Sequence, residues 1–245
     1  MSADLAVIGL GRMPYGDALG VQRDLAQRRI ERSLDRDLLL LVEHPPVVTL
    51  GRGSQAEHLV APREFLAAKG VELFEVERGG DVTYHGPGQL VGYPIYDLSQ
   101  HRQDLHWFLR ALEECLIASL REFGIPGERR AGYTGVWTAG RKIASIGIHV
   151  KQWVTWHGFA LNVMTDLSLF DLIVPCGIPD VTMTSVQKEL GERTPRDVWG
   201  RALDAVVLAF CEVFGQRAEM VDLEAVRRLT FRPSAQRTGR TPESP

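Results

Sequence analysis

Cys176 is the cysteine whose surroundings suit a nucleophile. It lies in residues 174–179, which read V-P-C-G-I-P. A proline on each side removes backbone donors and restricts φ, so this stretch is neither the interior of a helix nor a central strand. A rigid loop with glycine directly after the cysteine leaves the sulfur open on one side, which suits a reactive thiol. Spacing alone leaves a catalytic and a structural role equally open.

The other two cysteines fit packing positions. Cys115 lies on the apolar face of a long expected helix, and Cys211 lies at helical spacing with Val207 and Phe214. Free cysteine is among the most buried residue types, so we expect both thiols in the core. Three widely spaced cysteines without a C-x-x-C pair argue against a disulfide framework and a structural zinc site. We expect no metal and no cofactor.

A working thiol needs a cation or a base nearby, because a cysteine with the ordinary pKa of about 8.5 is only a few per cent thiolate at neutral pH. The candidate partners are His85, His149, His157 and Lys142. Lys142 opens an expected strand, in phase with alternate apolar residues up to Val150, where it either extends into solvent or is partly desolvated and titratable.

The histidines are no easier to rank by pattern. His157 shares an expected face with Phe159, Leu161 and Val163, as a core histidine would. His85 lies in a glycine-bracketed loop, where we expect it to be the more exposed of the two. The pattern therefore leaves the partner of the thiol open.

Strands that come in runs, with helices at intervals, must hold these residues. Strands are expected over residues 6–10, 37–42, 47–50, 71–77, 81–85 and 89–96, and an antiparallel meander over 132–138, 142–150 and 155–163. Helices are expected over 15–34, 62–69, 104–123 and 195–214. We expect 37–42 and 47–50 to form a pair of buried strands. This order predicts an α+β fold, a single domain with a mixed, largely antiparallel sheet and flanking helices.

Length and charge exclude several function classes. The chain has 245 residues, with 28 Lys plus Arg against 31 Asp plus Glu and a net charge of -3, so no global positive field would hold nucleic acid. No apolar run approaches the roughly 18 residues of a membrane span, and the N-terminus lacks a signal-peptide pattern. We expect a cytoplasmic monomer with a domain over residues 1–229 and a basic, disordered tail over 230–245.

The run 78–90, R-G-G-D-V-T-Y-H-G-P-G-Q-L, closely resembles the signature loop of the lipoyl(octanoyl) transferases. Further blocks agree with that family in order, and they are 43–46 with 49–51, 135–137, 142–147, 157–163 and 175–178. Lipoate and biotin protein ligases look related in fold, but they activate a free acid with ATP and lack the P-C-G thiol loop. The resemblance implies the catalytic fold that these ligases share.

The resemblance implies an octanoyltransferase of lipoate biosynthesis. In that family an octanoyl group moves from the phosphopantetheine thioester of acyl carrier protein to a lysine of a lipoyl domain. Its thioester nucleophile matches Cys176, and the lysine partner of that nucleophile matches Lys142. Its substrate-contacting positions match Arg78, Gly79, Gly80, Asp81, Val82, Thr83, Tyr84, His85, Ser145, Ile146, Gly147, Gly158, Phe159 and Ala160.

The partners that the resemblance implies are octanoyl-acyl carrier protein as donor, and as acceptors the lipoyl domains of 2-oxoacid dehydrogenase complexes and the glycine cleavage H protein. Because acyl carrier proteins are strongly acidic, we expect a local basic patch. Candidates for it are Arg28, Arg29, Arg32, Arg129, Arg130, Arg141 and Lys151. An ATP-dependent ligase and a non-catalytic binding protein for lipoyl domains or acyl chains remain as alternatives.

Two details of the site stay open at this level. Gly147, Gly158 and Ala160 are small residues on neighbouring expected strands, and they fit a narrow slot for a straight acyl chain and close packing equally well. Backbone N–H groups of Gly177 or of Gly79 and Gly80 could hold the oxyanion of the tetrahedral intermediate.

Overall fold

Two β-sheets organise the protein. The computed structural model describes residues 4–178 and 181–228. The main sheet has seven strands in the order β10-β1-β2-β6-β9-β8-β7, and a small sheet has three, in the order β4-β3-β5. The strands of the main sheet are β1 (Asp4–Arg12), β2 (Asp37–Glu43), β6 (Gln89–Ile95), β7 (Val136–Thr138), β8 (Arg141–Lys151), β9 (Val154–Asn162) and β10 (Arg217–Met220). Those of the small sheet are β3 (Val47–Leu50), β4 (Glu72–Glu75) and β5 (Val82–His85).

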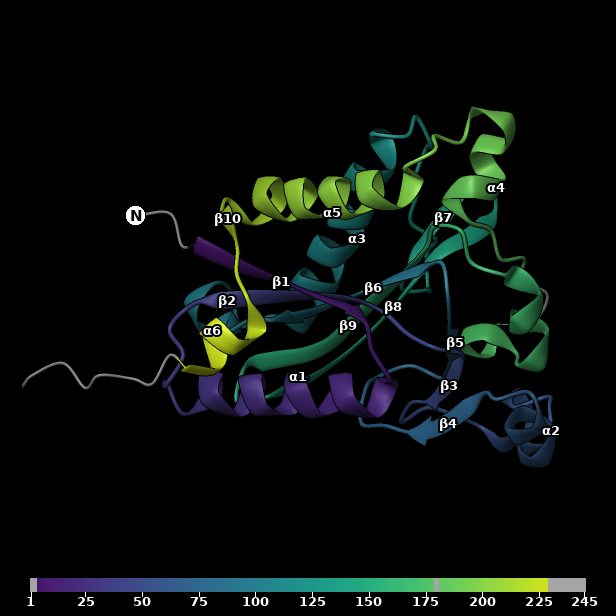
Figure 1. Ribbon diagram of the computed structural model, residues 1–245, viewed down its shortest axis with the longest axis horizontal. Coiled ribbons are helices and arrows are strands. Elements are labelled where there is room, and N and C mark those ends of the chain that lie inside the picture. The colour runs from purple at the N-terminus through teal and green to yellow at the C-terminus, as the bar shows by residue number, and fades with distance from the viewer. Residues whose placement is uncertain (1–3, 179–180, 229–245) are drawn as a thin grey trace, which may run out of the picture.

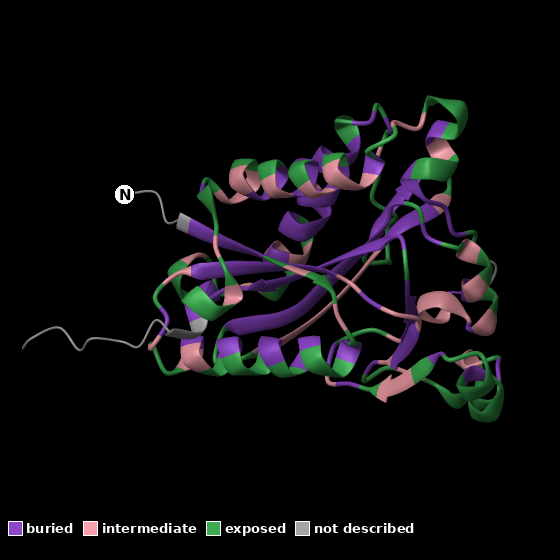
Figure 2. Ribbon diagram, in the orientation of Figure 1, coloured by how far each residue is buried: buried purple, intermediate pink, exposed green. Residues whose placement is uncertain are grey.

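Helices cover both faces of the main sheet (Figure 1). The helices are α1 (Tyr15–Ile30), α2 (Arg63–Ala68), α3 (Leu105–Arg121), α4 (Val186–Leu190), α5 (Val198–Phe214) and α6 (Leu223–Arg228). One core cluster lies between the sheet and α3 and α5, and a second lies between the sheet and α1. Figure 2 shows the consequence, because the central strands of the main sheet are buried while the outer sides of the helices are exposed. The described part of the chain therefore buries both faces of one sheet.

The predicted fold class is confirmed. β1 pairs in parallel with β2 and β10, whereas β2–β6, β6–β9, β9–β8 and β8–β7 are antiparallel. The meander β7–β8–β9 follows the predicted order. The sheet is thus mixed and largely antiparallel.

The two buried strands predicted over residues 37–42 and 47–50 are confirmed, but they lie in different sheets. β2 belongs to the main sheet, between β1 and β6, and β3 lies in the small sheet between β4 and β5. Pro45 and Pro46 separate the two strands and prevent a continuous ladder. The chain leaves one sheet and enters the other at this point.

Three elements were absent from the predicted set. β10 has only four residues and all four are exposed, so its pattern is too short to distinguish it from a loop. α4 is a single short turn. α6 carries Val226, which is 2% exposed in the second core cluster, so the domain extends at least to this helix. The predicted tail over 230–245 lies outside the described residues.

The two structural cysteines differ. Cys115 is 1% exposed in the cluster under α3 and α5, as predicted. Cys211 is only partly buried, because it lies beside the buried stripe of α5 rather than within it. The prediction of a core position is therefore wrong for Cys211.

The small sheet anchors the segment that leads to Cys176. Val48, Val82 and Tyr84 pack with Phe170 and Ile173 in a third core cluster. The short 3-10 turn Leu167–Leu172 supplies Phe170, so the chain before the thiol is fixed by apolar contacts.

Candidate active site

Cys176 lies in the turn Pro175–Gly177 with a left-handed backbone, φ 57° and ψ 22°. Few residues other than glycine adopt this conformation, and it persists only where the surroundings enforce it. The N–H of Val174 donates to the carbonyl of His58 at 2.8 Å, and the N–H of Gly177 donates to the carbonyl of Val174 at 3.0 Å. Gly177 is also left-handed, and a Cβ there would overlap the Asp81 carboxylate. The turn is therefore held tightly on both sides of the sulfur.

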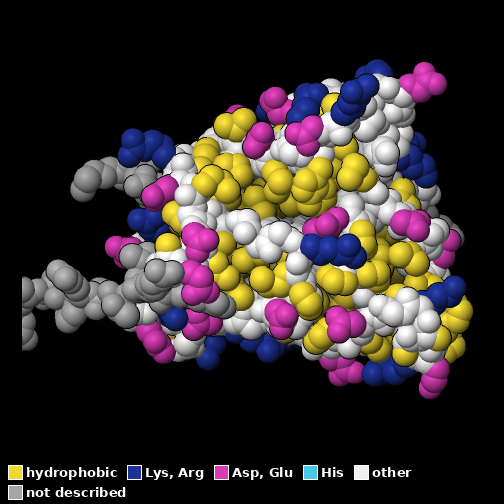
Figure 3. All heavy atoms as spheres, viewed as in Figure 1, with side chains coloured by type: hydrophobic (Ala, Val, Ile, Leu, Met, Phe, Trp, Pro, Cys, Tyr) yellow, Lys and Arg dark blue, Asp and Glu magenta, His cyan; other side chains and the backbone are white. Residues whose placement is uncertain are grey.

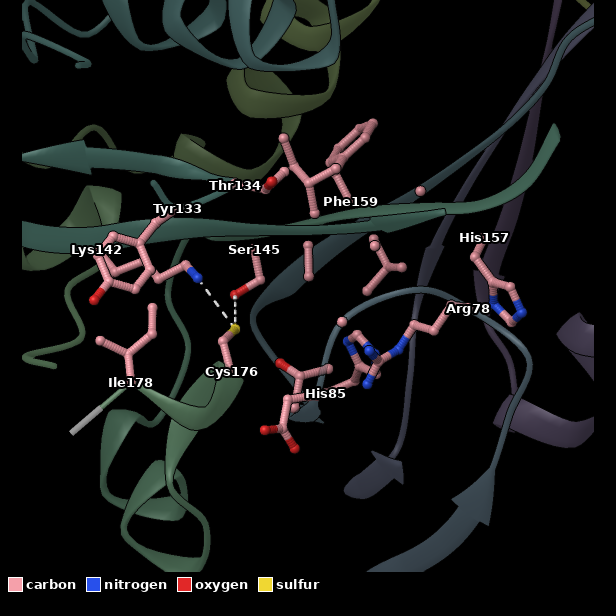
Figure 4. Close-up of a pocket in the computed structure, with 18 of the residues that line it drawn as sticks. Arg78, His85, Tyr133, Thr134, Lys142, Ser145, His157, Phe159, Cys176 and Ile178 are labelled. Atoms are coloured by element: carbon pink, nitrogen blue, oxygen red, sulfur yellow. Dashed lines mark hydrogen bonds between the residues drawn. The ribbon is translucent and has the colours of Figure 1, made fainter. Parts of the chain in front are cut away.

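Lys142 contacts the thiol directly. Its Nζ lies 3.1 Å from Cys176 Sγ, and Ser145 Oγ lies 3.8 Å from the same sulfur (Figure 4). Lys142 is 1% exposed, so the interpretation that it extends into solvent is wrong. Within the described ranges no carboxylate forms an ion pair with it, and its Nζ lies 4.9 Å from the centroid of the Trp137 ring. The site thus contains a buried amine whose main polar neighbour is a thiol.

A β-bulge explains why Lys142 and Ser145 point the same way. Strict alternation along β8 would place them on opposite faces. The register of β7 on β8 shifts, with Trp137 opposite Lys142 but Val136 opposite Ala144, so Ile143 is the extra residue. Ile143 and Ala144 both join the core cluster under α3 and α5. The predicted phase of Lys142 with Ala144 is therefore wrong, and the bulge puts the amine on the thiol side.

Residues 77–79 pair with the part of β8 that β7 leaves free. The N–H of Gly79 donates to the carbonyl of Ile148 at 2.8 Å, and His149 Nδ1 donates to the carbonyl of Glu77 at 3.0 Å. A Cβ on Gly147 would lie 2.8 Å from the Gly79 carbonyl oxygen. The glycine at 147 allows this loop to approach the strand.

Gly158 also lies where a Cβ atom would not fit. A Cβ there would overlap the Gly92 carbonyl oxygen of β6, so this glycine also serves close backbone packing. Of the small residues, Ala160 alone has a side chain, and it lies 3% exposed in the second core cluster while lining the cavity beside the thiol. Both glycines line the cavity as well, but packing accounts for their size.

One cavity of about 190 Å³ joins the predicted residues. All of them line it except Gly79, Val82 and Tyr84. Val82 and Tyr84 instead face the third core cluster, and Tyr84 packs edge-on against Phe170 with ring centroids 5.5 Å apart. Lining residues that sequence reasoning missed are Tyr15, Val91, Tyr93, Gly132, Tyr133, Thr134 and Ile178. In the sequence, nothing distinguishes Tyr15 and Tyr93 from tyrosines of a hydrophobic core.

The histidines do not contact the thiol. His85 is 7% exposed and His157 2%, so both are buried, and His85 is the more exposed of the two, as predicted. Burial lowers the pKa of His85 to about 3, and its Nδ1 donates to Gln89 Oε1 at 2.8 Å. His157 has a left-handed φ of 56°, and its Nε2 lies 3.8 Å from Glu77 Oε2, away from the cluster that holds Phe159 and Leu161. The predicted face for His157 is therefore wrong.

Arg78 brings a second cation to the cavity. Its Nη2 donates to the carbonyl of Thr49 at 2.7 Å and to Thr49 Oγ1 at 2.9 Å. The residue is 7% exposed, and among the described residues no carboxylate pairs with it. Burial lowers the pKa of Arg78, but a guanidinium keeps its charge in proteins. The cavity thus carries positive charge that the chain does not neutralise by ion pairing.

Comparison with known proteins places the chain. Residues 14–207 match the family described as the lipoyl protein ligase A/B catalytic domain. The chain belongs to this family. Octanoyltransferases of Gloeobacter violaceus and of a Nostoc species are 51% and 49% identical to it, over 88% and 86% of this chain and 92% of each relative. The octanoyltransferase that the motifs predicted is thereby confirmed.

Solved structures of this family share the fold. A crystal structure of lipoate-protein ligase A bound with ATP superposes with a TM-score of 0.73 and 18% identity, covering 93% of both chains. A putative lipoate protein ligase from T. acidophilum gives a TM-score of 0.71, also at 18% identity and 93% of both chains. At this identity the likeness shows the ligase-type fold that the motifs implied, and the chemistry must come from the residues of the cavity.

Three candidates for the predicted basic patch are paired with acidic residues. Arg29 is buried and paired with Asp37, so it is no part of a surface. Arg129 pairs with Glu113 and Glu114, and Arg141 pairs with Glu189. On the face in Figure 3, basic and acidic side chains are interspersed.

Neither a membrane span nor a metal site is found in the ranges 4–178 and 181–228. No helix there is both long and apolar enough to cross a bilayer. No group of 3 or more His, Cys, Asp and Glu side chains there could hold a metal ion.

Proposed function

We propose that this octanoyltransferase takes its acyl group from the thioester of acyl carrier protein, carries it on Cys176, and delivers it to a lysine of a lipoyl domain. The observation that carries the proposal is the 3.1 Å contact of Lys142 Nζ with Cys176 Sγ inside the cavity. A cation at this distance stabilises a thiolate, the form of cysteine that attacks carbonyl carbons. We also propose that the protein acts as a monomer in the cytoplasm.

The first half-reaction exchanges one thioester for another. The Cys176 thiolate attacks the carbonyl carbon of the donor, a carbon–sulfur bond forms to Cys176, and the bond to the phosphopantetheine sulfur breaks. The departing thiolate takes a proton from the ammonium of Lys142, which becomes neutral. Because the bond broken and the bond formed are alike, this step needs no ATP.

The second half-reaction forms an amide. The acceptor lysine begins as an ammonium and must lose two protons, one before attack and one as the amide forms. Neutral Lys142 accepts one of them, the other goes to solvent, and Cys176 leaves as a thiolate. Both residues thereby return to their starting states, and the whole reaction releases one proton.

Of the backbone N–H groups predicted to hold the oxyanion, one is available in the described part of the chain. The N–H groups of Gly79 and Gly177 already donate to Ile148 and Val174. Gly80 also lines the cavity, and no acceptor for its N–H is recorded in the described part of the chain. We propose the Gly80 N–H as a donor to the oxyanion of the tetrahedral intermediate.

Intact-mass spectrometry after mixing with octanoyl-acyl carrier protein tests the proposal. The wild-type chain should gain the mass of one octanoyl group, and Cys176→Ser should gain none. Cys211→Ser is the matched control, because it removes a partly buried thiol outside the cavity and should be acylated like the wild type. An unmodified wild-type chain would contradict the thioester intermediate.

Two further arms separate the alternatives. Incubation with ATP and free octanoate should release no AMP, whereas an ATP-dependent ligase would release it. Addition of a lipoyl domain to the acylated chain should move the octanoyl mass to that domain. If the protein were a non-catalytic binding protein for lipoyl domains or acyl chains, the Cys176→Ser variant would bind them as well as the wild type.

A further inference from the structure

The cavity changes in character from one end to the other. Near the thiol its walls include Ile146, Phe159 and Ile178, which are apolar. At the other end it is lined by Arg78 and His157, of which His157 lies farther from Cys176 in Figure 4. An acyl chain that starts at the sulfur would therefore leave an apolar region and approach a polar one.

Strand register gives the direction and the length of this path. Ser145, which contacts the thiol, pairs with Ala160, and Ile148 further along β8 pairs with His157. The three strand steps from Ser145 to Ile148 span roughly 10 Å. An extended octanoyl chain has seven carbon–carbon bonds of about 1.5 Å and advances roughly 9 Å. The eighth carbon would thus reach the polar end and no further.

Three polar groups at that end form no hydrogen bond within the described residues, although His157 Nε2 lies 3.8 Å from Glu77 Oε2. Arg78 Nε and His157 Nε2 are buried without a hydrogen bond, in side chains that are 7% and 2% exposed. Tyr15 is 1% exposed, lines the same cavity, and has no recorded hydrogen bond from its hydroxyl. Burial raises the pKa of Tyr15 to about 12, so the hydroxyl keeps its proton and can donate it.

A purely structural role does not account for these groups. Buried polar atoms in proteins are almost always hydrogen-bonded, and each one left unpaired costs stability. His44 and Tyr93, close by, follow that rule. His44 Nδ1 donates to the carbonyl of Met13 at 2.8 Å, and its Nε2 accepts from the Tyr93 hydroxyl at 2.7 Å. Buried polar atoms without a hydrogen bond also occur away from the cavity, at Gln22, Arg29, Ser54 and Trp137, but Arg78 and His157 line the cavity wall, where a ligand can meet them.

We propose that Tyr15, Arg78 and His157 form a polar subsite for the far end of the acyl chain, which disfavours a ninth methyl carbon and accepts a hydrogen-bond acceptor in its place. The inference rests on the proposed acyl transfer through Cys176 and specifies which acyl chains that site takes. Arg78 and Tyr15 present N–H and O–H donors, so the favoured terminal group is an acceptor such as a hydroxyl oxygen. A longer alkyl chain would cover these donors without pairing them.

A pair of isosteric donors tests the subsite in the wild-type enzyme. Nonanoyl and 8-hydroxyoctanoyl thioesters of acyl carrier protein have equally long chains and differ only in a terminal methyl or hydroxyl group. We expect kcat/KM for the hydroxyl chain to exceed that for nonanoyl by about tenfold, because a site that hydrogen-bonds a hydroxyl rejects the analogue without it. Equal values, or a preference for nonanoyl, would overturn the subsite.

Tyr15→Phe removes one donor while keeping the ring. The preference for 8-hydroxyoctanoyl over nonanoyl should fall by about fivefold, the worth of one hydrogen bond. Tyr96→Phe is the matched control, because it removes a buried hydroxyl that donates to Gln216 outside the cavity and should leave the ratio unchanged. A ratio of two substrates does not depend on the amount of folded protein.

An assay of octanoyl transfer distinguishes failure of the polar subsite from failure of the proposed function. If octanoyl is transferred but the two longer chains are used alike, the subsite is wrong and the proposed function stands. If octanoyl is not transferred from the thioester donor at all, the proposed function fails first.

Discussion

Two buried polar clusters of this protein have opposite characters. Around Asp37, at the end of the main sheet remote from the thiol, the carboxylate accepts from Arg29 Nη2 at 3.1 Å, His101 Nε2 at 2.5 Å and Gln216 Nε2 at 2.9 Å. Around the cavity, Lys142 and Arg78 are buried cations with no carboxylate partner in the described residues. In the first cluster the chain itself supplies the donors to the Asp37 carboxylate, although Arg29 Nε has no hydrogen bond, and these contacts tie β2 to α1 and to the start of β10. The second cluster is left for a substrate to complete.

The difference teaches how to separate structural polar groups from functional ones. A satisfied network in a low-dielectric interior stiffens the fold. Unpaired charges in the same interior cost stability, and they persist where the reaction needs them. Cys176 and His157 are two of the non-glycine residues with left-handed φ, and both lie at the cavity, one at each end. Mutations around the cavity should therefore lower octanoyl transfer, whereas mutations around Asp37 should lower the free energy of unfolding.

The largest effect is expected for Lys142→Met. This substitution removes the cation beside Cys176 with little change in shape, and octanoyl transfer should fall about a thousandfold, within the range for loss of a positioned acid–base group. The free energy of unfolding should stay the same or rise, because a desolvated ammonium is lost and Cys176, left without it, can take up a proton and become a neutral thiol. Transfer assays and urea unfolding on the same preparation measure both.

Lys69→Met is its control, because Lys69 is exposed and lies outside the cavity. It should change neither quantity. A Lys142→Met protein that unfolds far more easily than the wild type would show that Lys142 is a structural residue and would remove the contrast between the clusters.

Asp37→Ala should have the opposite signature. It leaves Arg29 buried without its carboxylate, and we expect a loss of about 3 to 4 kcal/mol in the free energy of unfolding. Transfer per folded molecule should be unchanged, because Asp37 does not line the cavity. Urea titration followed by an assay at low denaturant separates the two effects.

The exposed ion pair of Arg28 with Asp24, whose side chains are 30% and 47% exposed, supplies the comparison. Asp24→Ala should cost less than about 1 kcal/mol. If Asp37→Ala cost no more than that, the cluster around Asp37 would not be what holds these elements together.

The sequence predicted the larger features of the fold because their signals are local. Alternation and apolar faces located the meander β7–β8–β9 and the long helices, and proline and glycine marked the turn at Cys176. β10 was missed because it has only four residues, all of them exposed, and its pairing with β1 is set by tertiary structure. An edge strand of this length is too short for its periodicity to be recognised.

The cavity was predictable in membership but not in geometry. Motif resemblance placed Lys142 with Cys176, while periodicity put Lys142 on the wrong face, because a single bulge at Ile143 inverts the alternation. Tyr15 was missed altogether, since a tyrosine on a helix gives no sign of facing a cavity formed by strands far along the chain. Long-range contacts of this kind have no signature in a single sequence.

The smallest effect expected is a change in how stability depends on pH. His44, behind the cavity wall, is neutral because burial lowers its pKa to about 4. The unfolded chain binds that proton below pH about 6.5. Unfolding therefore takes up a proton between pH 6.5 and 4, and stability falls as the pH falls through this window.

His44→Phe should reduce the slope of the free energy of unfolding against pH in this window by up to about 1.4 kcal/mol per pH unit. His106→Gln, an exposed histidine, should not alter it. Urea unfolding at a series of pH values gives the slopes, and an unchanged slope in His44→Phe would mean that His44 is already charged in the folded protein.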